Sequence, residues 1–69
     1  MVYLIKTKSD WFECKCLLNG LTLEMLGART DIHPSCYSVA LKKYHLKGGK
    51  EVVAAQLDRM ITQYSERND

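Results

Sequence analysis

The stretch from Thr22 to Lys43 constrains the fold more than any other, because its pattern indicates two short helices joined by a tight turn. Thr22 can cap the first helix, and Gly27 leaves room for the second helix to cross closely. Asp31 is expected to supply the turn, since Asp tolerates left-handed backbone better than most residues. Pro34 starts the second helix, because proline fits the first helical turn and keeps the preceding residue out of helical geometry. The stretch therefore predicts a helix-turn-helix.

The second of these helices, Pro34 to Lys43, has two different faces. Its apolar face carries Tyr37, Ala40, Leu41 and Tyr44. Its outer face carries Ser35, Cys36, Ser38, Val39, Lys42 and Lys43. Small polar side chains and a valine can contact base edges, and the lysines that follow can contact phosphates. This outer face is typical of a helix that recognises DNA.

Two more helices are predicted on either side of this motif. Ser9 marks the start of the first one, and Asn19 with Gly20 marks its end. The clearest helical periodicity runs from about Lys50 to Tyr64, whose apolar stripe is predicted to form the core. That stripe consists of Val53, Leu57, Met60, Ile61 and Tyr64. The chain is therefore predicted to be all-α, with four helices.

The predicted domain spans residues 9–64 and is flanked by two short segments. Residues 1–8 form an N-terminal arm or a short strand, and residues 65–69 form a polar tail. A chain of 69 residues makes one small domain, and such a domain buries only about 60% of the surface that its unfolded chain exposes. We therefore expect it to need a compact arrangement or a partner.

Composition excludes several classes of protein. Hydrophobic residues at 46% and charged residues at 26% are typical of a globular domain and not of a disordered tail. No apolar run approaches the roughly 20 residues that a membrane span needs, and no cationic segment leads into a signal-peptide core. We therefore expect a protein of the bacterial cytosol, associated with the nucleoid when it binds DNA.

Positive charge gathers in the second half of the motif and the loop behind it. Residues 29–50 carry five basic residues against Asp31 alone, whereas residues 9–28 and 51–69 are net acidic. The predicted phosphate contacts are Thr22, Arg29, Lys42, Lys43, Lys47 and Lys50. The last two flank a pair of glycines at a helix start, where free N–H groups attract anions. A surface loop with solvated lysines explains the same two residues equally well.

Several short pieces of the sequence occur in the order and spacing of a known family. They are Asp10-Trp11, LTL at Leu21 to Leu23, Pro34, Ala40-Leu41, and KGGKEVVAAQL from Lys47 to Leu57. Over residues 10–57 the chain resembles the Ner-type regulators of Mu-like phages and their bacterial Nlp relatives. The resemblance implies a lambda-repressor-like helix-turn-helix fold that binds operator DNA to regulate phage or host genes. It also implies double-stranded DNA as the partner, with a homodimer on two half-sites.

The chain offers no catalytic or cofactor site, and we expect neither an enzyme nor a small-molecule ligand. Its three cysteines, Cys14, Cys16 and Cys36, are predicted to be reduced thiols. One residue between the first two does not match the spacing of a zinc site, so no metal is predicted. Neither histidine has a catalytic partner in a recognisable pattern. Cys36 opens the recognition helix, and a redox-sensitive thiol there remains open.

Two other readings of the chain also remain open. In one, the chain is a small protein-binding inhibitor or adaptor with an exposed apolar patch and no specific DNA binding. In the other, residues 1–7 form a strand that pairs with a second copy, as in a ribbon-helix-helix DNA-binding protein. That fold would place Tyr3, Ile5 or Lys6 on bases.

Overall fold

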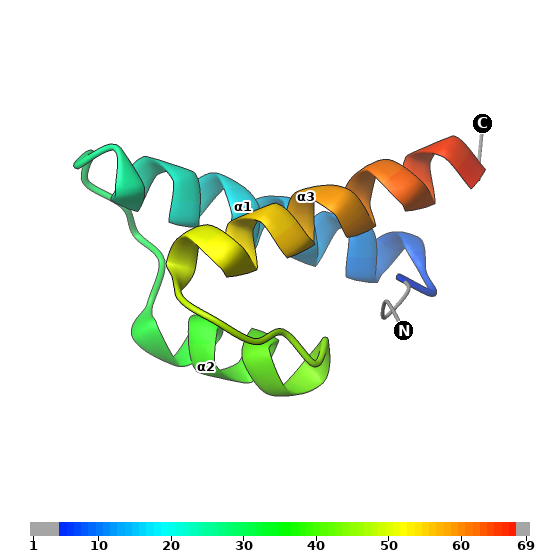
Figure 1. The fold of residues 1–69 in the computed structure, drawn as a ribbon, viewed down its shortest axis with the longest axis horizontal. Coiled ribbons are helices and arrows are strands. Elements are labelled where there is room, and N and C mark those ends of the chain that lie inside the picture. The colour runs from blue at the N-terminus through cyan, green and yellow to red at the C-terminus, as the bar shows by residue number, and fades with distance from the viewer. Residues whose placement is uncertain (1–4, 68–69) are drawn as a thin grey trace.

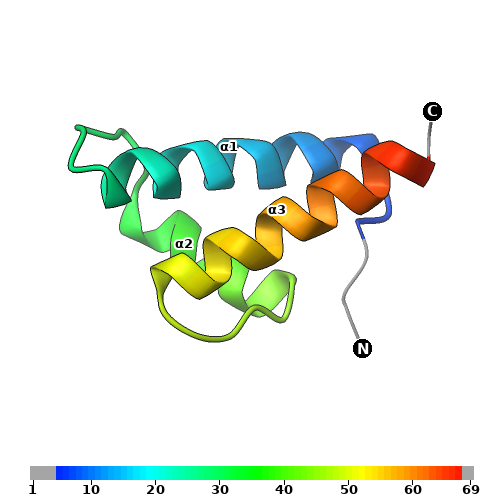
Figure 2. The ribbon, with the colours of Figure 1, turned by 45° about the horizontal axis from the view of Figure 1, so that its top comes forward.

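The computed structural model describes residues 5–67, and over that range the chain is all-helical. Its helices are α1 (Lys8–Met25), α2 (Pro34–Lys43) and α3 (Lys50–Arg67). α1 and α3 pack side by side, and α2 lies beneath them (Figure 1, Figure 2). The all-α prediction is confirmed, whereas the described part of the chain holds three helices and not the predicted four. None of its helices has both the length and the apolar character needed to cross a membrane.

α1 begins one residue before the predicted start and is not interrupted at Asn19 and Gly20. Thr7 caps it, and its hydroxyl accepts a hydrogen bond from the N–H of Asp10 at 3.1 Å. Gly20 does not end the helix because it is a buried contact point. A Cβ added there would lie 1.7 Å from Cδ1 of Ile32, which packs on the glycine from the next segment. The prediction of two helices in this stretch is therefore wrong.

The connection between α1 and α2 also differs from the predicted tight turn. Gly27, with φ 81°, ends α1, and the N–H groups of Gly27 and Ala28 donate to the carbonyls of Glu24 and Leu23. These two bonds form the usual C-terminal glycine motif. Gly27 has no neighbour within 4 Å of an added Cβ, so it does not serve the close helix crossing. The left-handed residue of this segment is therefore Gly27. The prediction that Asp31 takes this role is wrong.

The connection runs over residues 26–33, which is longer than the turn of about three to four residues typical of a helix-turn-helix. Because α1 is continuous, Thr22 lies inside it instead of capping a helix. Its hydroxyl donates to the carbonyl of Leu18 at 2.8 Å.

α2 has the predicted bounds. Pro34 occupies its first turn, and His33 caps it in extended geometry, with Nδ1 accepting from the N–H of Ser35 at 3.2 Å. The predicted apolar face is confirmed, since Ala40 and Tyr44 are buried and the other two members are partly buried. After the helix, His45 adopts φ 54°, a left-handed conformation that His tolerates better than most residues. This conformation turns the chain back toward the core, where Leu46 is buried.

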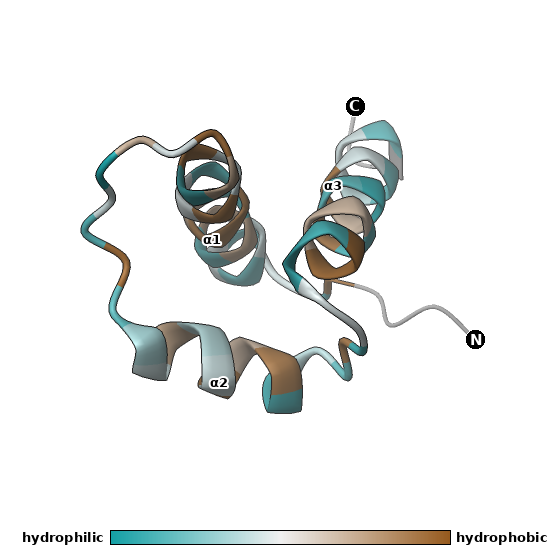
Figure 3. Cartoon of the chain, turned by 60° about the vertical axis from the view of Figure 1, so that its left-hand side comes forward, coloured by the Kyte–Doolittle hydropathy of each residue, from teal (hydrophilic) through white to brown (hydrophobic). Residues whose placement is uncertain are grey.

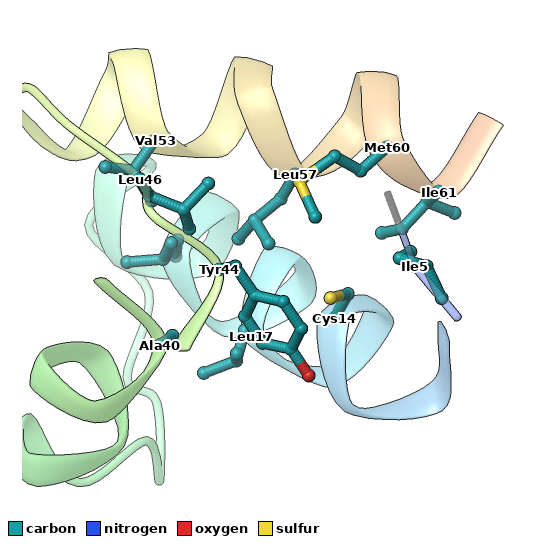
Figure 4. Close-up of a cluster of buried hydrophobic side chains, with 11 residues drawn as sticks. Ile5, Cys14, Leu17, Ala40, Tyr44, Leu46, Val53, Leu57, Met60 and Ile61 are labelled. Atoms are coloured by element: carbon teal, nitrogen blue, oxygen red, sulfur yellow. The ribbon is translucent and has the colours of Figure 1, made fainter. Parts of the chain in front are cut away.

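The core lies where α1, α3 and the end of α2 meet. Its buried members are Ile5, Cys14, Leu17, Leu21, Ala40, Tyr44, Leu46, Val53, Leu57, Met60 and Ile61. Figure 4 shows Tyr44 and Leu46 reaching in from the end of α2 between side chains of α1 and α3. Viewed nearly along α1 and α3, α2 crosses below both (Figure 3). The predicted apolar stripe of α3 is confirmed. α2 is attached to the core by its C-terminal end.

The two flanking segments are only partly described. Residues 1–4 and 68–69 lie outside the described range, and with them half of the predicted arm or strand and the end of the predicted tail. Ile5 is buried in the core, and Lys8 is already helical. Residues 65–67 of the predicted tail belong to α3.

Candidate nucleic-acid interface

The outer face of α2 is exposed, but the predicted base-contacting residues do not form a single patch. Ser35, Cys36 and Val39 line one side of the helix, where they face a groove toward α1. Ser38 lines a separate recess on the other side, together with Pro34. Val39 is 57% exposed. The structure therefore brings three of the four residues together and places the fourth at the opposite edge of the helix.

The groove lies between α1, the connection and the first half of α2, and it has a volume of 740 Å³. Its walls are Glu13, Cys16, Leu17, Thr30, Asp31, Ile32, His33, Ser35, Cys36 and Val39. Ile32 and Leu17 give it an apolar floor, and Glu13, Asp31 and His33 add polar groups. Its size is within the range of ligand and peptide sites.

The five cations predicted to contact phosphate fall into two groups. Lys43 pairs with Glu13 at 3.1 Å and with Asp10 at 3.5 Å, and Lys50 pairs with Glu24. In contrast, the ammonium groups of Lys42 and Lys47 have no carboxylate of residues 5–67 within ion-pair distance. Arg29 is exposed in the connection and is likewise without a described ion pair. Among the predicted phosphate contacts, Lys42, Lys47 and Arg29 are therefore the cations most available to an anionic partner.

Lys43 belongs to a polar cluster that fastens the end of α2 to α1. The buried Tyr44 donates its hydroxyl to Oε1 of Glu13 at 2.9 Å, next to the Lys43 pair. The hydrogen bond with Glu13, together with the charges of Glu13 and Asp10, raises the pKa of Lys43. Burial and the bond to Glu13 raise the pKa of Tyr44 far above its usual range, so its hydroxyl stays a neutral donor.

The second carboxylate of the cluster, Asp10, is held in its charged form. Burial acts to raise the pKa of Asp10, but the hydrogen bonds from Thr7 and the charge of Lys43 outweigh it. The pKa of Asp10 therefore lies below its usual value. The cluster thus combines two carboxylates with one lysine.

Gln56 is a residue of the candidate interface that sequence reasoning missed. Its side-chain amide donates to the carbonyl of Lys47 at 3.0 Å, and its oxygen accepts from the N–H of Lys47 at 3.2 Å. These two bonds fix the backbone of Lys47 against α3. In the sequence Gln56 is only a polar position beside the apolar stripe, and no local signal marks its contact nine residues back.

The thiols differ in their surroundings. Cys16 and Cys36 are exposed, whereas Cys14 is buried against Tyr44 and Leu57 in the core (Figure 4). Burial raises the pKa of the Cys14 thiol to about 11. Within residues 5–67, no three His, Cys, Asp or Glu side chains are grouped so that they could hold a metal ion.

The three thiols should differ in their rates of alkylation. At pH 8, iodoacetamide is expected to modify Cys16 and Cys36 quickly and Cys14 only after unfolding, because the thiolate is the reactive form and burial suppresses it at Cys14. Mass spectrometry of peptides from native and urea-unfolded protein measures the rates. Equal rates at all three thiols in the native protein would contradict the burial of Cys14.

Comparison of the chain with protein-family models, with curated proteins and with solved structures found no match.

Proposed function

We propose that this protein is a DNA-binding transcriptional regulator whose α2 enters the major groove of operator DNA. The observation that carries the proposal is the charge of residues 34–50, which contain four lysines and no carboxylate. Within that segment Lys42 and Lys47 are exposed and have no ion pair with the described residues. Exposed lysines without a carboxylate partner suit a polyanionic backbone.

The anchoring of α2 is compatible with this role. Tyr44 and Ala40 bury the C-terminal half of the helix, whereas Ser35, Cys36 and Val39 leave its N-terminal half exposed. Helix-turn-helix proteins place the N-terminal part of the recognition helix against base edges. Ser35 and Ser38 can donate or accept hydrogen bonds there, and Val39 can contact a thymine methyl. The resemblance to Ner-type regulators supports the same assignment.

The proposed mechanism involves no chemistry. The protein occupies an operator and thereby blocks or alters the access of polymerase. Lys42 contacts phosphate from the end of α2, and Lys47 does so from the loop, where Gln56 fixes its backbone. One module with few available cations binds weakly, so two copies on adjacent half-sites are expected.

Binding to fluorescent DNA fragments from the gene's own upstream region tests the proposal. Changing Lys42→Ala and Lys47→Ala together is expected to weaken binding about 10-fold or more and to reduce the slope of log K against log salt by about 1.8, because two phosphate contacts are lost. Fluorescence anisotropy at salt concentrations from about 50 to 200 mM measures both the affinity and the salt slope.

The matched control is the pair Lys6→Ala and Arg59→Ala, which removes the same charge from exposed positions outside α2 and its loop. It should leave affinity and slope nearly unchanged. If the control weakens binding and the Lys42/Lys47 pair does not, the assigned DNA face is wrong. A loss in the control would also favour the ribbon-helix-helix reading, which uses Lys6.

A protein-binding module is the second candidate, because the groove beside α2 is apolar and measures 740 Å³. In this reading Val39 and Cys36 contact a partner peptide and not bases. Such a protein would bind DNA only weakly and without sequence preference. Absence of binding to any fragment at low salt would therefore favour this candidate over the regulator.

A further inference from the structure

One face of α1 carries large apolar side chains that stay exposed in the single chain. Phe12 is 55% exposed, Leu23 is 44% exposed and Leu26 is 77% exposed. On a helix, these positions lie opposite Cys14 and Leu21, which are buried against the core. The face therefore points away from the core. Its contacts within the chain lie at its edges, where the ring of Phe12 meets that of Trp11 at 5.1 Å between centroids and Cys16 lines the groove toward α2.

The residues of this face follow the spacing of a helix-pairing seam. Phe12, Cys16, Asn19, Leu23 and Leu26 are separated by steps of four, three, four and three residues. All five are exposed. Such alternation is the seam of a heptad repeat, in which one helix packs its side chains into those of a second helix.

The charges beside the seam indicate that the second helix is α1 of another copy of the chain. Lys8 and Lys15 lie along one flank, and Glu13 lies along the other. If two copies of α1 pack in parallel, the basic flank of each faces the acidic flank of the other, whereas antiparallel packing sets the lysines against lysines. Glu13 already pairs with Lys43, but the cluster also contains Asp10 and so retains negative charge for a second cation.

We propose that this face is a dimer interface in which α1 packs in parallel against α1 of a second copy of the chain. From Phe12 to Leu26 the seam is only ~21 Å long at 1.5 Å per residue. The helices are already folded on α3, so pairing does not have to supply the free energy of helix formation. A short seam of this size predicts a weak dimer, in equilibrium with monomer at roughly 10 to 100 μM, as for small transient interfaces.

Sedimentation equilibrium of the free protein across this concentration range, with no DNA present, is the first test. The wild-type chain is expected to show a monomer–dimer equilibrium, and Leu23→Glu is expected to remain monomeric because a charge in the seam cannot be buried. Val52→Glu is the matched control, since Val52 is 49% exposed on α3 and lies off the seam. Circular dichroism checks that both variants keep their helix content.

Cross-linking tests the parallel arrangement. In a parallel two-fold pair each seam residue faces its own copy, so Cys16 meets Cys16 of the second chain. With Cys36→Ser as background, mild oxidation is expected to yield a disulfide-linked dimer through Cys16, and Leu23→Glu is expected to abolish it. A monomer at every concentration, or a dimer indifferent to Leu23→Glu, overturns the interface; a dimer that forms no Cys16 cross-link overturns its parallel arrangement. Because DNA is absent, failure of DNA binding does not alter either outcome.

Discussion

Replacing Tyr44 with alanine is expected to lower the free energy of unfolding by about 3–5 kcal/mol, the usual cost of deleting a buried aromatic ring. Tyr44 is 1% exposed and lies between side chains of all three helices (Figure 4). A domain of this size has a total stability of roughly 3–10 kcal/mol, so the substitution should remove about a third of it or more, and should unfold the domain if the total lies at the low end of that range. Urea unfolding followed by circular dichroism measures the change.

The variant Tyr44→Phe is the control for this experiment. It keeps the ring and loses the hydroxyl, which donates to Glu13, a carboxylate that Lys43 continues to neutralise. The expected loss is about 0.5–1.5 kcal/mol. Equal effects of the two substitutions would show that the ring does not anchor α2. DNA binding by Tyr44→Phe should remain close to that of the wild type.

Gly20→Val is expected to destabilise the domain by about 2 kcal/mol or more through overpacking. An added Cβ at this position lies 1.7 Å from Cδ1 and 2.2 Å from Cγ1 of Ile32, so the valine must displace the side chain of Ile32. The better helix propensity of valine offsets less than about 1 kcal/mol of that cost. Thermal or urea unfolding provides the measurement.

A second substitution separates crowding from other causes. Ile32→Ala removes the atoms that collide, so the double variant should be less destabilised than the sum of the two single variants, with a coupling of about 1 kcal/mol or more. Additive effects would mean that Gly20 and Ile32 do not touch. Stability of Gly20→Val at the wild-type level would mean that Gly20 is not a buried contact.

The sequence predicted α2 and α3 well because their signals are local. Proline at a first helical turn and a regular apolar stripe both act within a few residues, and Pro34 and Leu57 are examples. The sequence was misleading at Gly20, because a glycine after asparagine is also the commonest helix end. What decides between helix end and close contact is Ile32, twelve residues further along the chain, which no local pattern reveals.

Less of the candidate site could be predicted, because most of its contacts join residues that are distant in sequence. Exposure of Ser35 and Lys42 follows from the two faces of α2. The ion pairs of Lys43 and Lys50 with α1, and the support of Lys47 by Gln56, join residues that are distant in sequence. The side-chain pairing of a cation is a tertiary property, and counting lysines along the chain cannot give it.

The internal ion pairs have a consequence for how DNA would be held. Carboxylates of α1 already neutralise Lys43 and Lys50, so a phosphate that binds either lysine competes with that carboxylate. The carboxylate set free would gather cations from solution and so offset those released from the DNA. The effective valence of the interface would then be set by Lys42, Lys47 and Arg29, and binding would be less sensitive to salt than the basic residues of the segment suggest.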